Sequence, residues 1–414
     1  MYIEGANIPV MTTDGTITKR VYFNNAATTL ALRPAIWNVN ANIPLLTYID
    51  APGQLGKRTT ISYEDVRDRI LDFVGGDTSK DTVIYVKNST EAINLLSELF
   101  YQEDPEQVVI TTAMEHMANY LPFISRFKTA VVAVTKDGDI DLDDLENKLN
   151  TYKNKVKLLA ITGASNVTGI TPPIYKIAKL VHEYGAKILV DAVQLVQHRS
   201  FHMKPYDDDE HIDFVVFSAH KCYTSFDGGV LIGPYDFFSK YKPFLDGAGT
   251  TKFISSEKII YSEPPKRYEA GYPDIFGVRA MGEALKFLEN VGLNNIAEYE
   301  KKLYHHARRG LQSIPKVKMY AQDSKQINIP YIAFNVDGIY YTDVANYLAY
   351  NHGIEVGAGT SGADLYVQSL TGVSPTEAYE LYVKGKATGI IRISLGMYNT
   401  LSEIDRFVDA IRNL

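Results

Sequence analysis

The chain has 414 residues, of which 45% are hydrophobic and 22% are charged. This length exceeds one ordinary domain, and the composition is typical of a globular protein and not of a disordered one. The formal net charge of −7, without a block of Lys and Arg, argues against nucleic acid as a partner.

The segment from Met1 to Asn7 contains an acid and has no apolar core, so we do not interpret it as a signal peptide. No uninterrupted apolar run approaches the length needed to span a membrane. The single cysteine, Cys222, excludes an internal disulfide and most cysteine-based metal sites. We therefore expect a cytoplasmic protein without a membrane contact or a metal site.

Helical and strand-like patterns alternate from about residue 63. Apolar residues at helical spacing predict helices over 63–74, 90–100, 143–150 and 174–184. Short, β-rich apolar runs predict strands at 82–86, 108–110, 131–134, 158–161, 188–190, 214–217 and 230–232. Strands that are apolar throughout belong in a sheet covered on both faces, so this half predicts a three-layer α/β/α domain with a mostly parallel sheet.

The rhythm changes after about residue 284. A long helix over 282–313, broken near Gly292, precedes scattered strands such as 331–335. A last strand at 390–394 precedes a final helix from Ser402. We predict a large domain over residues 21–284 and a smaller α+β domain over 285–414, with residues 1–20 packed on the smaller one.

The segment Phe217 to Tyr223 places a lysine directly after an apolar strand. Lys221 at such a strand end can face a pocket and form an imine with an aldehyde. Ser218 and His220 beside it can hold a phosphate. Taken alone, the segment equally describes a surface loop that carries a lysine.

A second apolar strand ends in an acid at Asp191. A carboxylate at this edge of an α/β sheet lies where ligands bind, and it can keep a pyridine nitrogen protonated. The alternative is a helix cap, which Asp favours. Gln194, one turn further on, can reach a phenolate oxygen. Asn166 follows another strand as a possible donor, although turn chemistry also explains an Asn there.

Asn88 to Asn94 follows a strand and opens a helix, which is where backbone N–H groups bind phosphate. Ser89 and Thr90 add hydroxyl groups, and the same pattern is also a capping box. His116 lies beyond the next strand, where a flat imidazole can stack on a cofactor ring or serve structure alone. Each signal is weak by itself, and their order along one α/β domain is what gives them weight.

Taken together these residues resemble the class V aminotransferases, and most closely the group II cysteine desulfurases and selenocysteine lyases. The matching segments run from about residue 21 to the C-terminus: Asn25–Thr29, Thr90–Asn94, Glu115–Asn119, Ser165–Val167, Asp191–Gln194, Ser218–Lys221, Glu269–Pro273 and Arg392–Asn399. The resemblance implies the fold of the type I pyridoxal-phosphate enzymes, which is aspartate-aminotransferase-like, and a homodimer with active sites at the subunit interface.

The resemblance also implies a role for each matching residue. Lys221 looks like the Schiff-base lysine and the acid/base that moves the Cα proton. Asp191 would pair with the pyridinium nitrogen of pyridoxal 5'-phosphate. Arg392 would clamp the carboxylate of a small amino-acid substrate. The other implied cofactor contacts are His116 stacked on the ring, Gln194 and Asn166 on the phenolate side, and Ser89, Thr90, Ser218 and His220 on the phosphate.

The sequence departs from the family pattern in the segment that should bear a nucleophilic cysteine. By spacing, Gly362 occupies the position of that cysteine, and Gly357 the position of an arginine. Cys222 is fixed beside Lys221, and we expect its side chain to point away from the pocket. Tyr272 replaces a threonine that reaches the neighbouring subunit's phosphate, and Met117 replaces a second histidine.

Three functions stay open at this point. The first is an enzyme that acts on an L-amino acid without persulfide chemistry, either a transaminase or a β-eliminating C–S lyase. The second is a cysteine desulfurase or selenocysteine lyase with a sulfur acceptor outside the protein. The third is a catalytically silent scaffold that binds the cofactor. Retention of Lys221, Asp191, His116 and Arg392 argues against the third.

Overall fold

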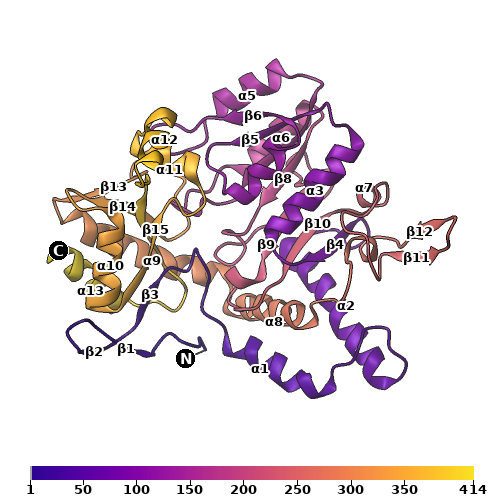
Figure 1. The fold of residues 1–414 in the computed structure, drawn as a ribbon, viewed down its shortest axis with the longest axis horizontal. Helices are drawn as coiled ribbons and strands as arrows, with labels where there is room; N and C mark the ends of the chain where they lie inside the picture. Colours follow the sequence, from indigo (N-terminus) through magenta and orange to yellow (C-terminus); the bar gives the residue numbers. More distant parts are fainter. Residues whose placement is uncertain (1) are drawn as a thin grey trace.

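The computed structural model describes residues 2–414, and its largest sheet has seven strands (Figure 1). Their order in space is β4 (Asp81–Val86), β10 (Gly229–Pro234), β9 (Phe214–Ser218), β8 (Lys187–Asp191), β7 (Val156–Thr162), β5 (Val108–Thr112) and β6 (Lys128–Val132). Pairings among β9, β8, β7, β5 and β6 are parallel, and β10 runs antiparallel to both β4 and β9. The predicted mostly parallel sheet is confirmed.

Helices cover both faces of this sheet because its strands are apolar on both faces. Ile188 and Val190 of β8 pack in one core with α2 (Gln54–Val74), α6 (Ile174–Glu183) and α8 (Ile275–Val291). Leu189 between them packs in the other core, with α3 (Ser89–Glu103) and α7 (Tyr235–Phe238). α5 (Leu142–Thr151) joins the first core through Leu145 and Leu149. The predicted three-layer arrangement is therefore present.

A second sheet of five strands has the order β13 (Val317–Met319), β14 (Tyr331–Val336), β16 (Ile390–Ser394), β15 (Ile354–Gly359) and β3 (Val21–Phe23). Its core includes α9 (Leu293–Gln312), α10 (Tyr341–His352) and α13 (Leu401–Arg412). The shorter helices α11 (Asp364–Thr371) and α12 (Pro375–Val383) join β15 to β16. No helix within residues 2–414 is long and apolar enough to cross a membrane.

The N-terminal segment lies with this smaller sheet. β1 (Pro9–Met11) and β2 (Ile17–Lys19) form a hairpin, and Arg406 of α13 hydrogen-bonds Thr18 and the backbone of Lys19. β3 pairs in parallel with β15. A large domain that began at residue 21 would separate β3 from its partner, so we propose to begin it after Phe23. The division near residue 284 stays a proposal.

The observed elements differ from the predicted ones mainly at their ends. α2 begins at Gln54, before the predicted residue 63, and β6 ends at Val132, before Val134. The predicted break at Gly292 is confirmed, because Gly292 has φ of 85° and separates α8 from α9. Two further elements are α1 (Arg33–Asn42) and the hairpin of β11 (Thr251–Ile254) and β12 (Ile259–Tyr261).

Candidate active site

A cavity of about 260 Å³ opens at the carboxyl ends of the parallel strands. Three adjacent strands end in polar residues there, β7 at Thr162, β8 at Asp191 and β9 at Ser218. Nine of the ten predicted site residues line this cavity, and Arg392 does not. The nine are Ser89, Thr90, His116, Asn166, Asp191, Gln194, Ser218, His220 and Lys221. Parallel strands gather these distant residues because their carboxyl ends meet at one edge.

Lys221 closes a single 3₁₀ turn, Ala219–Lys221, that follows β9. Burial lowers the pKa of its ammonium group to about 8, although Asp191 acts in the opposite direction. A lysine with a lowered pKa is partly neutral near physiological pH, and the neutral amine is the nucleophilic form. Lys221 is therefore suited to attack an aldehyde in the cavity.

Asp191 is a buried carboxylate without a cationic hydrogen-bond partner in the described chain. Its Oδ1 accepts a hydrogen bond from the Val193 backbone N–H at 3.1 Å. Burial raises the pKa of the carboxyl group to about 6, against the lowering effects of that hydrogen bond and of Lys221. Such a group gains free energy from a cation placed beside it.

The N-terminus of α3 forms one wall of the cavity. Asn88 caps the helix through a hydrogen bond from the Glu91 backbone N–H, and the Ser89 N–H donates to Ser218 Oγ at 2.9 Å. Ser218 is thereby tied to the helix start, with Thr90 beside it in the cavity wall. Backbone N–H groups and the helix dipole favour an anion at this end of the cavity.

His116 contributes a flat ring at the rim of the cavity. Its Nδ1 accepts a hydrogen bond from the Ala118 backbone N–H at 3.1 Å. Burial, followed by the charges of Lys221 and Arg392, lowers the pKa of the imidazole to about 4. Burial likewise lowers the pKa of His220 to about 4. Both imidazoles are therefore neutral at pH 7.

The segment after β15 closes over His116. Met117 N–H donates to the Gly362 carbonyl at 2.6 Å, and Asn166 Nδ2 donates to the Ser361 carbonyl at 2.8 Å. A Cβ atom at Gly362 would lie 2.5 Å from His116 Nε2. The amide of Asn166 thus holds this segment, and a side chain at residue 362 would require the His116 ring to shift.

Arg392 lies on β16 and is only 2% exposed. Its Nη1 donates to the Asn166 carbonyl at 2.6 Å and its Nη2 to Asn24 Oδ1 at 3.0 Å. Within residues 2–414 no carboxylate pairs with this guanidinium, and its Nε has no hydrogen-bond partner. Burial lowers the pKa of Arg392 to about 10. An anion next to it would relieve this uncompensated burial.

Cys222 is fully buried and contributes nothing to the cavity wall. Burial raises the pKa of its thiol to about 12, despite the opposing charge of Lys221. The thiolate is the nucleophilic form of cysteine, so a buried thiol of this kind is inert at neutral pH.

Sequence reasoning missed several residues that support the site. Asn24 holds Arg392, and Glu115 accepts hydrogen bonds from Thr112 and Asn119 to brace the turn before His116. Tyr331 and His198 form a chain of hydrogen bonds that ends at Gln194. The motif around His116 already contained Glu115, but no local pattern identified Asn24, Tyr331 or His198.

Comparison with known proteins supports this reading of the fold. The family model of the class-V aminotransferases matches residues 21–407. Cysteine desulfurases of Escherichia coli O139:H28 and Shigella sonnei are each 32% identical over 368 residues, which is 87% of this chain and 84% of theirs. The apo structure of cysteine desulfurase from Thermococcus onnurineus NA1 superposes with a TM-score of 0.84 at 27% identity and covers 95% of this chain and 94% of that one.

Proposed function

This chain belongs to the class-V aminotransferase family, and we propose that it uses pyridoxal 5'-phosphate to transform an L-amino acid without a protein-bound persulfide. The reaction is a transamination or a β-elimination that cuts a C–S bond. The observation that carries the proposal is the pairing of Lys221 and Asp191 in one cavity, while the single cysteine of the chain lies buried outside it.

The cavity fits the cofactor at each of its functional groups. Asp191 offers an uncompensated carboxylate for the pyridine nitrogen, and Lys221 offers an amine for the aldehyde. The start of α3, with Ser89, Thr90 and Ser218, would bind the phosphate. His116 would cover one face of the ring, with His220 near the phosphate. When bound, the cofactor withdraws electrons from the substrate Cα.

The remaining chemistry belongs to the side chains. The carboxylate of Asp191 would hold the proton on the ring nitrogen. Lys221 would take up the Cα proton and return it, because its lowered pKa lets the amine act as a base near neutral pH. The Asn166 carbonyl and Asn24 fix the guanidinium of Arg392, which would bind the substrate carboxylate.

Lys221→Ala tests the central assignment. Borohydride reduction of the wild-type protein with bound cofactor should fix the cofactor mass on the peptide that contains Lys221. The variant should show no fixed mass while it retains some bound cofactor. Lys87→Ala is the control, since Lys87 directly precedes the N-cap of α3 and yet does not line the cavity. Cofactor mass on another lysine, or on none in the wild type, would overturn the proposal.

Keto acids separate transamination from elimination. In a transaminase, an amino acid should convert the cofactor to its amine form and a keto acid should reverse the change. In a lyase, the cofactor spectrum should return unaided while a keto acid, ammonia and a thiol or sulfide accumulate. A screen of L-amino acids, followed by cofactor absorbance and by product, identifies the substrate.

The second candidate is a desulfurase that passes sulfur to an acceptor outside the protein. Its support is that the relatives named above are cysteine desulfurases. With free cysteine and an added thiol, which would be both the sulfur acceptor and the reductant, we expect slow turnover to alanine and sulfide, because the thiol of Cys222 is buried and its pKa is raised. A persulfide found on Cys222 during turnover, and lost in Cys222→Ser, would favour a desulfurase that uses its own cysteine.

We also propose that two copies of the chain form a homodimer. The β11–β12 hairpin projects from the large sheet (Figure 1) and exposes apolar residues on both of its faces. Ile254 pairs with Ile259 on one face, and Phe253 pairs with Ile260 on the other. All four are more than two-fifths exposed. A protruding hairpin of this composition needs a cover, and a second copy supplies one.

A further inference from the structure

Gln194 links the cavity to the smaller sheet. It follows β8 and lines the cavity, yet both ends of its amide are already bonded. Its Nε2 donates to the Ala26 carbonyl at 2.8 Å, and its Oε1 accepts from the hydroxyl of Tyr331 at 2.7 Å. Tyr331 is the first residue of β14, far from Gln194 along the chain.

The Ala26 carbonyl fixes which way this amide points. A carbonyl only accepts hydrogen bonds, so the amide nitrogen must face Ala26 and the amide oxygen must face Tyr331. The Tyr331 hydroxyl must then donate to Gln194, and its oxygen must accept from His198 Nε2, which lies 2.9 Å away. The direction of each hydrogen bond therefore follows from the one before it.

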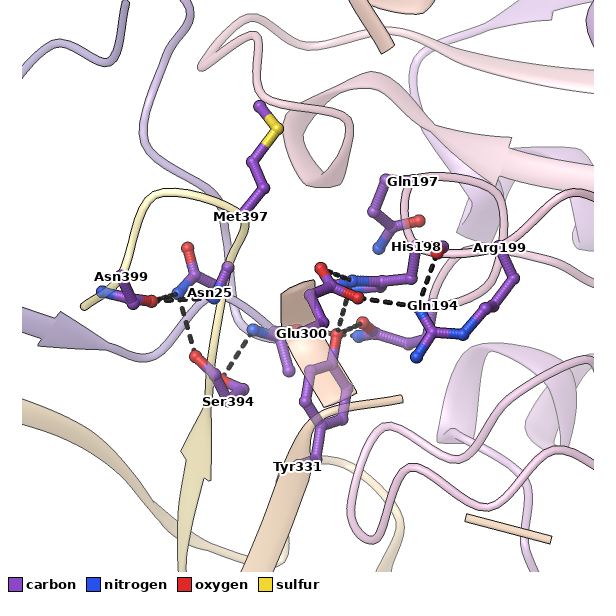
Figure 2. A network of polar contacts seen from close by, with 12 residues as sticks. Asn25, Gln194, Gln197, His198, Arg199, Glu300, Tyr331, Ser394, Met397 and Asn399 are labelled. Carbon is purple, nitrogen blue, oxygen red and sulfur yellow. Dashed lines mark hydrogen bonds and ion pairs between the residues drawn. The ribbon is translucent and has the colours of Figure 1, made fainter. Parts of the chain in front are cut away.

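The chain ends on a buried acid. His198 Nδ1 lies 2.7 Å from Glu300 Oε1, and the second oxygen of Glu300 accepts from Arg199 at 2.7 Å. Glu300 thus contacts His198 through one oxygen and Arg199 through the other, which fixes the position of the His198 ring. His198, Glu300 and Tyr331 are at most 1% exposed. Figure 2 shows this continuous line from Arg199 and Glu300 through His198 and Tyr331 to Gln194.

We propose that Tyr331, supported by His198 and Glu300, is a positioning residue that locks the Gln194 amide with one N–H directed at the ring oxygen of the cofactor. The inference rests on the proposed pyridoxal-phosphate function and deepens it. Gln194 Nε2 carries two hydrogens, and Ala26 engages one of them. The other is the donor that the ring oxygen would use.

The measurement is the absorbance of bound cofactor as a function of pH, without substrate. A hydrogen-bond donor to the ring oxygen stabilises negative charge on that oxygen. It therefore favours the deprotonated form of the bound cofactor over the protonated form. Loss of the oriented donor in Tyr331→Phe should therefore raise the midpoint pH of the spectral change. The shift should be about one pH unit, which corresponds to one neutral hydrogen bond.

Two further variants decide whether Tyr331 acts through Gln194. Gln194→Leu should raise the midpoint by a similar amount, and the double variant should match Gln194→Leu because only one interaction is lost. Tyr320→Phe is the matched control, since it removes a tyrosine hydroxyl that bonds Asn335 in the same part of the fold and does not line the cavity. Its midpoint should equal that of the wild type.

The outcomes separate this inference from the proposed function. An unchanged midpoint in Tyr331→Phe with cofactor bound, or an effect that adds to that of Gln194→Leu, would overturn the positioning role alone. A wild-type protein that binds no cofactor would overturn both. If Tyr331→Phe does not fold, His198→Asn removes the donor to Tyr331 and should give a smaller upward shift. No shift in that variant would also refute the role.

Discussion

Two charged residues at the site, Asp191 and Arg392, are buried without the partners that normally compensate them, and Lys221 beside Asp191 is half-buried. Asp191 has a raised pKa, and Lys221 and Arg392 have lowered ones, with burial as the largest cause for each. Burial of an unpaired charge costs free energy, so these groups lower the stability of the fold. The same groups would become favourable once the cofactor and a carboxylate substrate occupy the cavity.

Asp191→Asn should stabilise the cofactor-free protein at pH 8. The folded pKa of Asp191, about 6, lies above its ordinary value of 3.8, so its contribution to stability is lost as pH rises from about 4 through 6. The gain in the free energy of unfolding of Asp191→Asn over the wild type should be at most about 3 kcal/mol at pH 8 and should vanish near pH 3.5. Thermal unfolding of the cofactor-free protein across this pH range measures it.

Asp213→Asn is the matched control for that experiment. Asp213 is also buried, but hydrogen bonds from His182 and Lys187 outweigh the effect of burial and lower its pKa. Its loss should therefore destabilise the protein at pH 8. With cofactor present, Asp191→Asn should bind it more weakly than the wild type does. Equal behaviour of the two variants would contradict the distinction between a ligand-facing and a structural carboxylate.

Arg392→Ala should weaken binding of the amino-acid substrate by about 2–5 kcal/mol, because the variant would lose the proposed buried ion pair with the substrate carboxylate. Cofactor occupancy should be retained. Substrate titration by cofactor absorbance measures the first quantity, and stoichiometry measures the second. Arg406→Ala is the control, since Arg406 bonds the N-terminal hairpin away from the cavity. A parallel loss of cofactor in Arg392→Ala would assign this arginine to structure.

At the scale of elements, the end of β15 and the segment that follows it restrict which residue can occupy position 362 next to the His116 ring. The segment is held by Met117 and Asn166, and Gly362 has φ of 73°. This backbone conformation suits glycine, and independently of it a Cβ atom at residue 362 would require His116 or the segment to shift. A cysteine at residue 362 would therefore have to displace either the segment or His116.

Gly362→Ala should destabilise the protein more than Gly372→Ala and should alter the cofactor spectrum. Gly372 has nearly the same φ, 72°, but nothing lies within 4 Å of a Cβ placed there. Both variants carry the same backbone strain of roughly 1–2 kcal/mol, so their difference reports the contact with His116. Thermal melts with and without cofactor measure it, and equal losses would show that His116 moves away at little cost.

At the scale of the whole molecule, the smaller sheet holds residues that line the cavity of the larger one. Arg392 of β16 bonds the Asn166 carbonyl, and Tyr331 of β14 bonds Gln194. The segment after β15 lies over His116. Any shift between the two sheets would move the proposed substrate carboxylate site relative to the proposed cofactor site. The β11–β12 hairpin would in addition contact a neighbouring copy of the chain in the proposed dimer.

Ile254→Asp combined with Ile260→Asp should convert the proposed dimer to a monomer, because each charge would be buried at the interface. Sedimentation velocity measures the change. Tyr382→Asp on α12 is the control, since Tyr382 is 75% exposed and lies on the smaller unit away from the hairpin. A wild-type monomer, or a dimer that survives the double change, would contradict the proposal.

The sequence alone determined the large sheet and the residues at its edge. Each of Asp191, Ser218 and Lys221 stands at the end of an apolar strand or shortly after it. The apolar strand and the polar residue that follows it lie within a few neighbouring positions of the sequence. Strand ends of one parallel sheet must meet, so their convergence follows from local pattern. The break at Gly292 was predictable for the same reason, because backbone freedom is a local property of glycine.

Only the tertiary structure decided the rest. Tyr331 meets Gln194 across 137 positions of sequence, and Arg392 meets Asn24 across 368. No periodicity encodes such pairs, since they depend on how two sheets pack. The same holds for the raised pKa of the Cys222 thiol and the lowered pKa of Lys221, because burial acts on a charge through all of its surroundings and not through its neighbours in the chain.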